Sequence, residues 1–494
     1  MNVNNKFHNI RERMIIMSKK LSNFEIGVFA SGDLFGGGTA VIFSFFYLIF
    51  LTDVMGLQPA YAGTVGFIMS IFSLFAVPLM GFITDNTRSR FGRRRPYFLA
   101  GFFGIFASFF LMWNTIASTN QLILFVYVLF CQLFYTTINI MISVPYNAIN
   151  AEISVDPKER NHATGVRMII SQVSSLICAL LPLEIVKLFA NPANGYRVMA
   201  LVFGLFFAVP FLLMFLFNKE AVQVTTERMT FKLQEYIKPL KIKLFRNFAI
   251  LNMLTFAINA IISAILAYYM KYYLHRYSEL TYILGTMLII QTVTIPLVVK
   301  MTDLIGRPRS YRLFSTVSLA GLAVLAFVSP ATPGWLLYVT AGILGAGIGG
   351  IIVLMYTMYP DITDVGEYKT KERSAGIYNG VISFLRTVSG ALVGYIITLT
   401  IQFSGYIQPV KTTVDGMVQN IDQPQPNSVI WAFRIMICVV PILLTVFVIF
   451  FSKKYTLSNR VLDLLRRQLK IQRGDNEGAP LSEQEAAELE SIIR

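Results

Sequence analysis

The stretch GFITDNTRSRFGRRRPYFLAG, residues Gly81 to Gly101, places five arginines within the eight residues Arg88 to Arg95, between flanks that are almost free of charge. Outward from this stretch the chain keeps the same pattern, in which short basic segments separate long apolar runs. Apolar runs of about twenty residues have the length of a helix that crosses a bilayer. The sequence, 55% hydrophobic and 14% charged, therefore predicts an all-α polytopic membrane protein.

Twelve such runs occur in the 494 residues, and they define the predicted transmembrane helices: 26–51, 59–84, 97–116, 121–150, 166–189, 197–217, 247–270, 277–299, 312–329, 335–358, 375–404 and 428–452. The apolar stretch near the N-terminus is too short for a signal peptide. Cys131, Cys178 and Cys438 fall inside predicted spans, so we expect buried thiols, with no disulfide, metal site or cofactor.

The basic residues are distributed asymmetrically along the chain. With both termini inside, the cytoplasmic segments carry 35 Lys and Arg residues and the external loops carry 5. This bias orients membrane proteins, because cytoplasmic loops are enriched in positive charge. The orientation explains the net charge of +15 without a nucleic-acid partner. We therefore expect a multi-pass protein of a bacterial plasma membrane, with both termini cytoplasmic.

A Gly/Asp/Arg loop occurs twice, six spans apart. Asp85 precedes Arg88 and Arg93 after the second span, and Asp303 precedes Arg307 after the eighth. The repetition predicts two six-helix halves, 24–217 and 247–452, which follow an N-terminal segment (1–23), are joined by a linker (218–246) and precede a C-terminal tail (453–494). These five side chains are candidate gating residues that pair across the cytoplasmic mouth; the alternative is a charge cluster that only sets orientation.

Polar residues recur on single faces of four predicted helices, as expected for helices around a polar cavity. The fourth span carries Asn139, Ser143 and Asn147, and the eleventh carries Asn379, Ser383 and Arg386; the fifth and seventh spans carry similar stripes from Arg167 and from Asn252. Amides, hydroxyls and guanidinium groups suit a polyhydroxylated solute, neutral or anionic. The alternative is hydrogen bonding between helices, worth ~0.6 kcal/mol for each group.

Asp33 and Arg386 are the two charges predicted to lie deepest in the bilayer. Each costs roughly 2.5 to 3.5 kcal/mol at the centre of a helix, so each must face water, a ligand or an opposite charge. Gly36, Gly37 and Gly38 follow Asp33 and would allow a bend or a close neighbour. A structural ion pair is the alternative to a solute site. Trp113, Trp335 and Trp431 lie at predicted outer helix ends, which is typical of an aromatic belt.

Four ordered motifs resemble the glycoside/pentoside/hexuronide:cation symporters of the major facilitator superfamily, the family that includes melibiose permease. They are YLIFLTDVMGLQPAYAG (Tyr47–Gly63), GFITDNTRSRFGRRRPY, VPYNAINAEISVDPKERN (Val144–Asn161) and PDITDVGEYKTKERSAGIYNG (Pro360–Gly380), and the resemblance extends from Leu21 to about Tyr406. It implies twelve helices in two halves and a sugar site that includes Asp33, Arg167 and Arg386. By the predicted boundaries, however, Arg167 lies near a cytoplasmic helix end.

The sequence departs from the family pattern at the cation site. Two aspartates of the second helix ligate Na⁺ in melibiose permease, and Ser73 and Val77 occupy those positions here. Ser143 and Asn147 replace the aspartate and tryptophan of its galactoside site. The usual Na⁺ site is therefore absent. Asp33 could carry a proton, although an adjacent arginine would favour its ionised form.

From the sequence we predict a monomeric secondary transporter that moves a sugar or glycoside by alternating access. Proton symport and uncoupled uniport or exchange both stay open, and Na⁺ symport is disfavoured. A lipid or drug carrier on the same fold is an alternative, although it would need fewer amides and charges. An integral-membrane enzyme acting on lipid-linked sugar would need a catalytic constellation. The strongest carboxylate group, Asp361, Asp364 and Glu367, falls at a cytoplasmic helix end.

Overall fold

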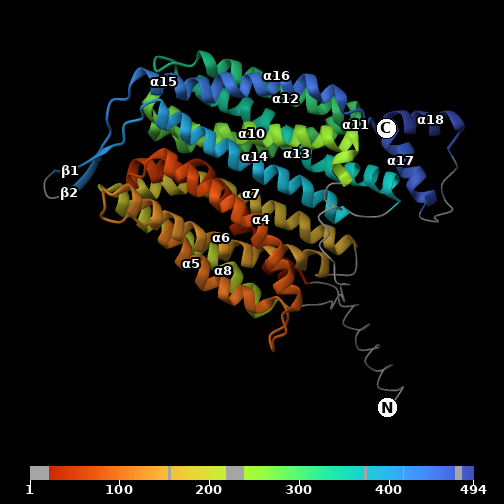
Figure 1. The fold of residues 1–494 in the computed structure, drawn as a ribbon, viewed down its shortest axis with the longest axis horizontal. Helices are drawn as coiled ribbons and strands as arrows, with labels where there is room; N and C mark the ends of the chain where they lie inside the picture. Colours follow the sequence, from red (N-terminus) through yellow and green to blue (C-terminus); the bar gives the residue numbers. More distant parts are fainter. Residues whose placement is uncertain are drawn as a thin grey trace. The chain divides into compact units, whose positions relative to one another are not determined.

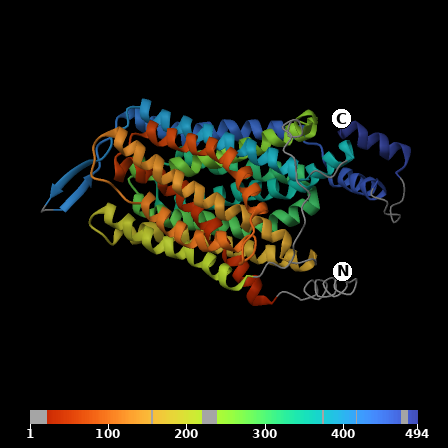
Figure 2. The same cartoon turned by 60° about the horizontal axis from the view of Figure 1, so that its bottom comes forward.

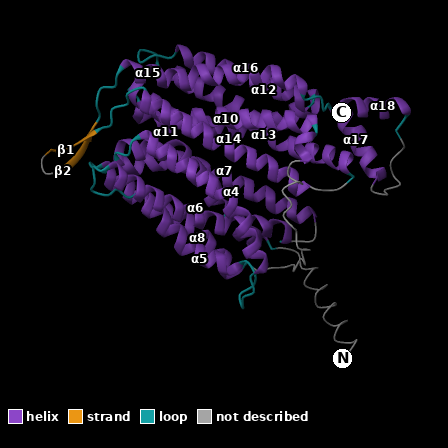
Figure 3. Ribbon diagram, viewed as in Figure 1, coloured by secondary structure: helices purple, strands orange, loops and turns teal. Residues whose placement is uncertain are grey.

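The fold was analysed in a computed structural model, which describes residues 22–153, 157–218, 238–371, 375–414, 417–472 and 481–493. Helices dominate the described chain (Figure 3). Twelve of them are long and apolar enough to cross a membrane, which confirms the predicted number. Nine spans are single α-helices: α4 (Pro59–Asn86), α5 (Arg95–Met112), α6 (Gln121–Glu152), α7 (Pro157–Lys187), α8 (Pro192–Phe217), α11 (Leu280–Ile305), α12 (Arg307–Phe327), α13 (Gly334–Thr370) and α14 (Ala375–Phe403).

The first, seventh and twelfth spans contain π-helical turns. The pieces are α2 (Asn23–Ser31), α3 (Asp33–Ile42) and π-turns at Phe43–Tyr47 and Phe50–Met55; α10 (Lys243–Tyr268) and a π-turn at Tyr269–Tyr273; and α15 (Asn427–Arg434), a π-turn at Ile435–Val439 and α16 (Val440–Phe451). The first and seventh spans both widen into π-turns at their C-terminal ends. Their shared irregularity is consistent with the predicted internal repeat.

The chain forms two compact units. Unit 1 takes its described residues from 1–229 and 408–423, and unit 2 takes its own from 230–407 and 424–494. In unit 1, α3 packs on α7, α4 on α6, and α5 on both α6 and α8 (Figure 1). In unit 2, the helices six spans later form the same pairs: α10 packs on α14, α11 on α13, and α12 on both α13 and α16 (Figure 2). The internal repeat read from the sequence is thus reproduced in the packing of each unit.

Several predicted helix boundaries differ from the structure, and two of them differ by nine residues or more. α7 begins at Pro157 instead of residue 166, and α13 continues to Thr370 instead of ending at 358. In both cases a charged segment that was read as loop is helical. The structure also contains a hairpin, β1 (Val410–Val414) paired antiparallel with β2 (Met417–Ile421), which the sequence did not predict. Most of the predicted N-terminal segment and most of the central linker lie outside the described residues.

Trp113 does not belong to an aromatic belt. Its side chain is fully buried and stacks on Tyr196 at 5.6 Å between ring centroids, with Phe50 at 5.0 Å. Trp335 and Trp431 are 66% and 57% exposed, as a belt requires. The three cysteines are free and buried.

Candidate functional site: an ion pair in unit 1 and a lone arginine in unit 2

Glycines bring the first span of unit 1 against its fourth and fifth spans. A Cβ atom on Gly32, between α2 and α3, would lie 2.6 Å from the ring of Tyr146 on α6. A Cβ atom on Gly37 would lie 2.3 Å from the carbonyl oxygen of Ser171 on α7. The close approach predicted after Asp33 is therefore present, and it positions the start of α3 beside α7.

Asp33 and Arg167 form a two-point ion pair across this contact. The Arg167 Nε–H donates to Asp33 Oδ2 at 2.5 Å, and Nη2 donates to Oδ1 at 3.2 Å. Both side chains are largely buried, with exposed fractions of 16% for Asp33 and 12% for Arg167. Bidentate pairs between arginine and carboxylate are stronger and more directional than single charge contacts. The pair therefore fixes both side chains in one geometry.

The guanidinium group of Arg167 is also held by rings and an amide. Its centre lies 4.3 Å from the ring centroid of Tyr146 and 5.2 Å from that of Phe29. Arg167 Nη2 donates to Asn147 Oδ1 at 3.3 Å, and the Tyr146 hydroxyl donates to the carbonyl of Phe29. Asn147 is exposed on the unit, so the polar cluster is accessible from that side.

The depth of Arg167 corrects its predicted position. Because α7 begins at Pro157, Arg167 lies ten residues along the helix, which corresponds to ~15 Å. It therefore lies within the helix and not at its end, and its side chain is largely buried, so its charge needs a partner. Asp33 is that partner within unit 1.

The remaining candidates in unit 1 surround this cluster less directly. Asn139 and Ser143 are partly buried on α6. Of the two residues at the family's cation positions, Ser73 donates its hydroxyl to its own helix at the Met69 carbonyl, and Val77 is 44% exposed. Neither offers an anionic oxygen, so this part of α4 is poorly suited to Na⁺.

Unit 2 holds Arg386 in a neutral setting. Arg386 Nη1 donates to the hydroxyl of Tyr356 at 3.2 Å, and the guanidinium lies 4.9 Å from the ring centroid of Phe256. Asn379 and Ser383 on the same helix, α14, are exposed on the unit. The polar face predicted on the eleventh span is therefore directed away from the core of unit 2.

Part of the polar stripe of the seventh span instead serves internal packing. Asn252 is buried and donates to the hydroxyl of Tyr359 at 3.0 Å, and Thr255 is hydrogen-bonded to Tyr311 at 2.7 Å. The sequence reading missed the tyrosines, because their rings count as apolar although their hydroxyl groups complete the polar contacts.

The candidate gating residues pair differently from the prediction. Asp85 lies 3.7 Å from Arg94, which is buried, whereas Arg88 is exposed and Arg93 is partly buried. In unit 2 the partner of Arg307 is Asp361 at 3.0 Å, and the Asp303 side chain is exposed. Asp361 is thus a charged site residue that the sequence reading had set aside. The sequence did carry a signal for this residue. In PDITDVGE, Asp361 and Asp364 are three residues apart and are followed by a Gly-Glu pair.

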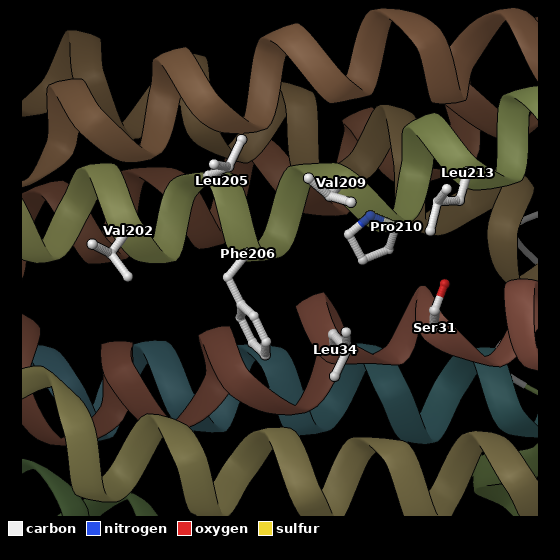
Figure 4. A pocket seen from close by; sticks show the side chains of 8 residues that line it. All are labelled: Ser31, Leu34, Val202, Leu205, Phe206, Val209, Pro210 and Leu213. Carbon is white, nitrogen blue, oxygen red and sulfur yellow. The ribbon is translucent and has the colours of Figure 1, made fainter.

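An apolar groove of ≈ 410 Å³ lies between α2/α3 and α8 in unit 1 (Figure 4). Its lining includes Leu34, Phe206 and Pro210, and the hydroxyl of its one polar residue, Ser31, donates to the Val28 carbonyl. A polyol would find only the acceptor lone pairs of this one hydroxyl there, so the groove is poorly suited to a sugar.

Comparison with solved structures identifies the fold. The chain resembles a bacterial homologue of the iron transporter ferroportin in its inward-facing state (TM-score 0.61, 14% identity, 88% of this chain and 99% of that one). It also resembles the nucleoside transporter NupG, solved as a D323A mutant (TM-score 0.58, 14% identity, 88% and 98%). At this identity the likeness shows the fold alone, which is that of the major facilitator transporters.

The sequence places the chain more narrowly. The family described as "MFS/sugar transport protein" matches residues 28–459, and the chain belongs to that family. Relatives include the uncharacterized symporter YnaJ of Bacillus subtilis (26% identity, 91% of this chain and 95% of that one). The isoprimeverose transporter of Lactiplantibacillus pentosus is 27% identical (81% and 82%), and the putative glycoside/cation symporter YagG of Escherichia coli is 25% identical (86% and 90%). The protein is therefore a multi-pass transporter and not an enzyme.

Proposed function

We propose that this protein is a sugar or glycoside symporter of the plasma membrane, with both termini cytoplasmic, and that Asp33 and Arg167 are central to solute binding. The observation that carries the proposal is the largely buried bidentate pair between the first and fifth spans, next to the accessible amide of Asn147. Carboxylate, guanidinium and amide groups together can donate to and accept from vicinal hydroxyls. The isoprimeverose and glycoside relatives support this class of solute.

For coupling we propose the proton. The symporter relatives support a cation, and the family's Na⁺ positions hold Ser73 and Val77. Protonation of Asp33 would remove the negative charge that holds Arg167, which would link proton binding to rearrangement of the solute site. Arg386, on the face of α14 directed away from the core of unit 2, is proposed as a further solute contact.

Uptake into proteoliposomes tests both statements. Radiolabelled isoprimeverose, a methyl xyloside, glucuronide and sulfoquinovose form the panel, because relatives are named for three of these compounds. We expect concentrative uptake of at least one solute under an inward proton gradient, abolished by a protonophore. Concentrative uptake driven by Na⁺ alone, and lost when choline replaces Na⁺, would contradict proton coupling. Failure to transport any sugar, with lipid or drug transport instead, would overturn the solute class.

A further inference from the structure

The C-terminal tail of unit 2 folds against the end of α13. The tail consists of α17 (Asn459–Gln472) and α18 (Glu483–Ile493), and Figure 1 shows α17 beside the C-terminal turns of α13. One face of α17 is buried through Val461, Leu462, Leu464, Leu465 and Leu469. At its start, Asn459 Nδ2 donates to the carbonyl of Thr302 at 3.2 Å, near the end of α11. The tail is thus attached to the ends of two spans of unit 2.

Asp361 links the tail to the body of the unit. Its side chain is completely buried, with Oδ2 3.0 Å from Arg307 Nη1 at the start of α12, and with Oδ1 accepting from Arg466 Nη2 of α17 at 3.4 Å. Within the described chain, Oδ2 accepts no hydrogen bond. The carboxylate therefore depends on the tail for a hydrogen bond, and a buried charge deprived of a partner is strongly unfavourable.

The two arginines that share Asp361 differ in their freedom to leave it. Arg307 is the first residue of α12, a membrane span, and its side chain is 19% exposed. Arg466 belongs to the tail, and its side chain is 49% exposed. Arg466 can turn into water at little cost, because about half of its side chain is already exposed. Arg307 is therefore the permanent partner, and Arg466 is the releasable one.

The part of α13 that carries Asp361 follows a weak point in the helix. Pro360 immediately precedes Asp361 and removes a backbone hydrogen bond, which favours bending there. Earlier in α13, a Cβ atom on Gly345 would lie 2.3 Å from the Met287 carbonyl oxygen, and one on Gly347 would lie 2.4 Å from the Ser318 nitrogen. That part of the helix is packed tightly against α11 and α12. The last turns pack on α14, where a Cβ atom on Gly366 would overlap the ring of Tyr378, and they are held in addition by Asp361 and the tail.

We propose that the C-terminal tail is a releasable clasp on the last turns of α13. In this clasp Arg466 holds Asp361 and thereby keeps the end of the helix in its present position. Release of Arg466 lets the segment after Pro360 move, while the part of α13 around Gly345 and Gly347 stays in place. α18 is held to α17 by the ion pairs Arg460–Glu488 and Arg467–Glu485, at 3.1 and 3.2 Å. Exposed pairs of this kind are weak and screened by salt, so they do not replace the contact of Arg466.

Cysteine labelling of the full-length protein tests the clasp without a known solute. In a variant without the three native cysteines, Val365→Cys reports on the last turns of α13 and Leu344→Cys on the tightly packed part; both residues are buried. We expect Arg466→Gln to accelerate the N-ethylmaleimide reaction at position 365 by roughly tenfold, the factor for a lost hydrogen bond to a charged group. The rate at position 344 should not change. Arg460→Gln, on the same helix but paired with α18, is the matched control and should leave both rates unchanged.

Two results would overturn the clasp: an unchanged rate at position 365 in Arg466→Gln, or an equal acceleration at positions 365 and 344, which would indicate general loosening. If Arg466→Gln does not fold, Arg466→Lys replaces it, because lysine keeps the charge with a single-point contact. An intermediate rate at position 365 is then expected, and a rate no higher than that of the parent contradicts the proposal. Since labelling requires no transport, its outcome is independent of the sugar assays.

Discussion

Asp33 and Arg167 are 134 positions apart in the chain and yet share two hydrogen bonds. Such a pair has two interpretations, a structural brace or a solute site, and they predict different behaviour of a double variant. Asp33→Asn leaves Arg167 without a counter-charge in a largely buried place, so it should reduce both the melting temperature and uptake. Asp33→Asn/Arg167→Gln removes both charges, and we expect it to recover stability by roughly 1 to 3 kcal/mol relative to additivity.

Transport distinguishes the interpretations. If the two side chains bind the solute, the double variant stays inactive although it is stable, which thermal unfolding and uptake measured on the same preparation would show. Recovery of uptake together with stability would mean that the pair is only structural. Lys300→Gln is a suitable control, because Lys300 is exposed on α11, lies outside the candidate site and gating residues, and should affect neither measurement.

The sequence identified charged candidate residues more readily than it placed them along their helices. Asp33 and Arg386 were recognisable because a charge inside an apolar run is rare and costly. Arg167 was placed at a helix end, since the apolar run begins only at residue 166 while the helix begins at Pro157. Asp361 was lost for the same reason, because α13 continues twelve residues past the predicted end at 358. Hydropathy reports where a helix meets lipid, and a helix that extends into water carries no such signal.

Among the helical elements, α3 and α7 are in close contact because glycine residues stand where a side chain would not fit. Gly37→Ala would place a methyl group 2.3 Å from the Ser171 carbonyl oxygen, which is backbone and cannot rotate away. We expect a loss of about 1 to 3 kcal/mol, as for other overpacked contacts, measured as a lower denaturation midpoint in detergent.

Gly27→Ala, in α2 of the same span, is the matched control. A Cβ atom there has nothing within 4 Å, so alanine should stabilise the helix by up to about 1 kcal/mol. Equal effects of the two substitutions would show that helix propensity, and not the close contact, governs this span.

For the whole molecule, the repeated packing pairs show how much a single sequence can predict. The number of spans and the division into repeated halves followed from two signals, run length and the recurring Gly/Asp/Arg loop. The hairpin β1–β2 could not be predicted in this way, because a short segment between two spans has no periodicity to read. The ion pairs of the candidate gating residues could not be predicted either: Arg307 pairs with Asp361, 54 positions along the chain, and not with its neighbour Asp303.

The three tryptophans are divided between the two units, so intrinsic tryptophan fluorescence can report on each unit separately. Trp113 is sealed in an aromatic cluster of unit 1, while Trp335 and Trp431 are on the surface of unit 2. In nanodiscs that contain brominated lipids, we predict that fluorescence from unit 2 is quenched and that a blue-shifted component from Trp113 persists. Trp113→Phe should remove this component. Its persistence in that variant would contradict the assignment. Solute titrations could then be followed separately in each half of an unmodified transporter.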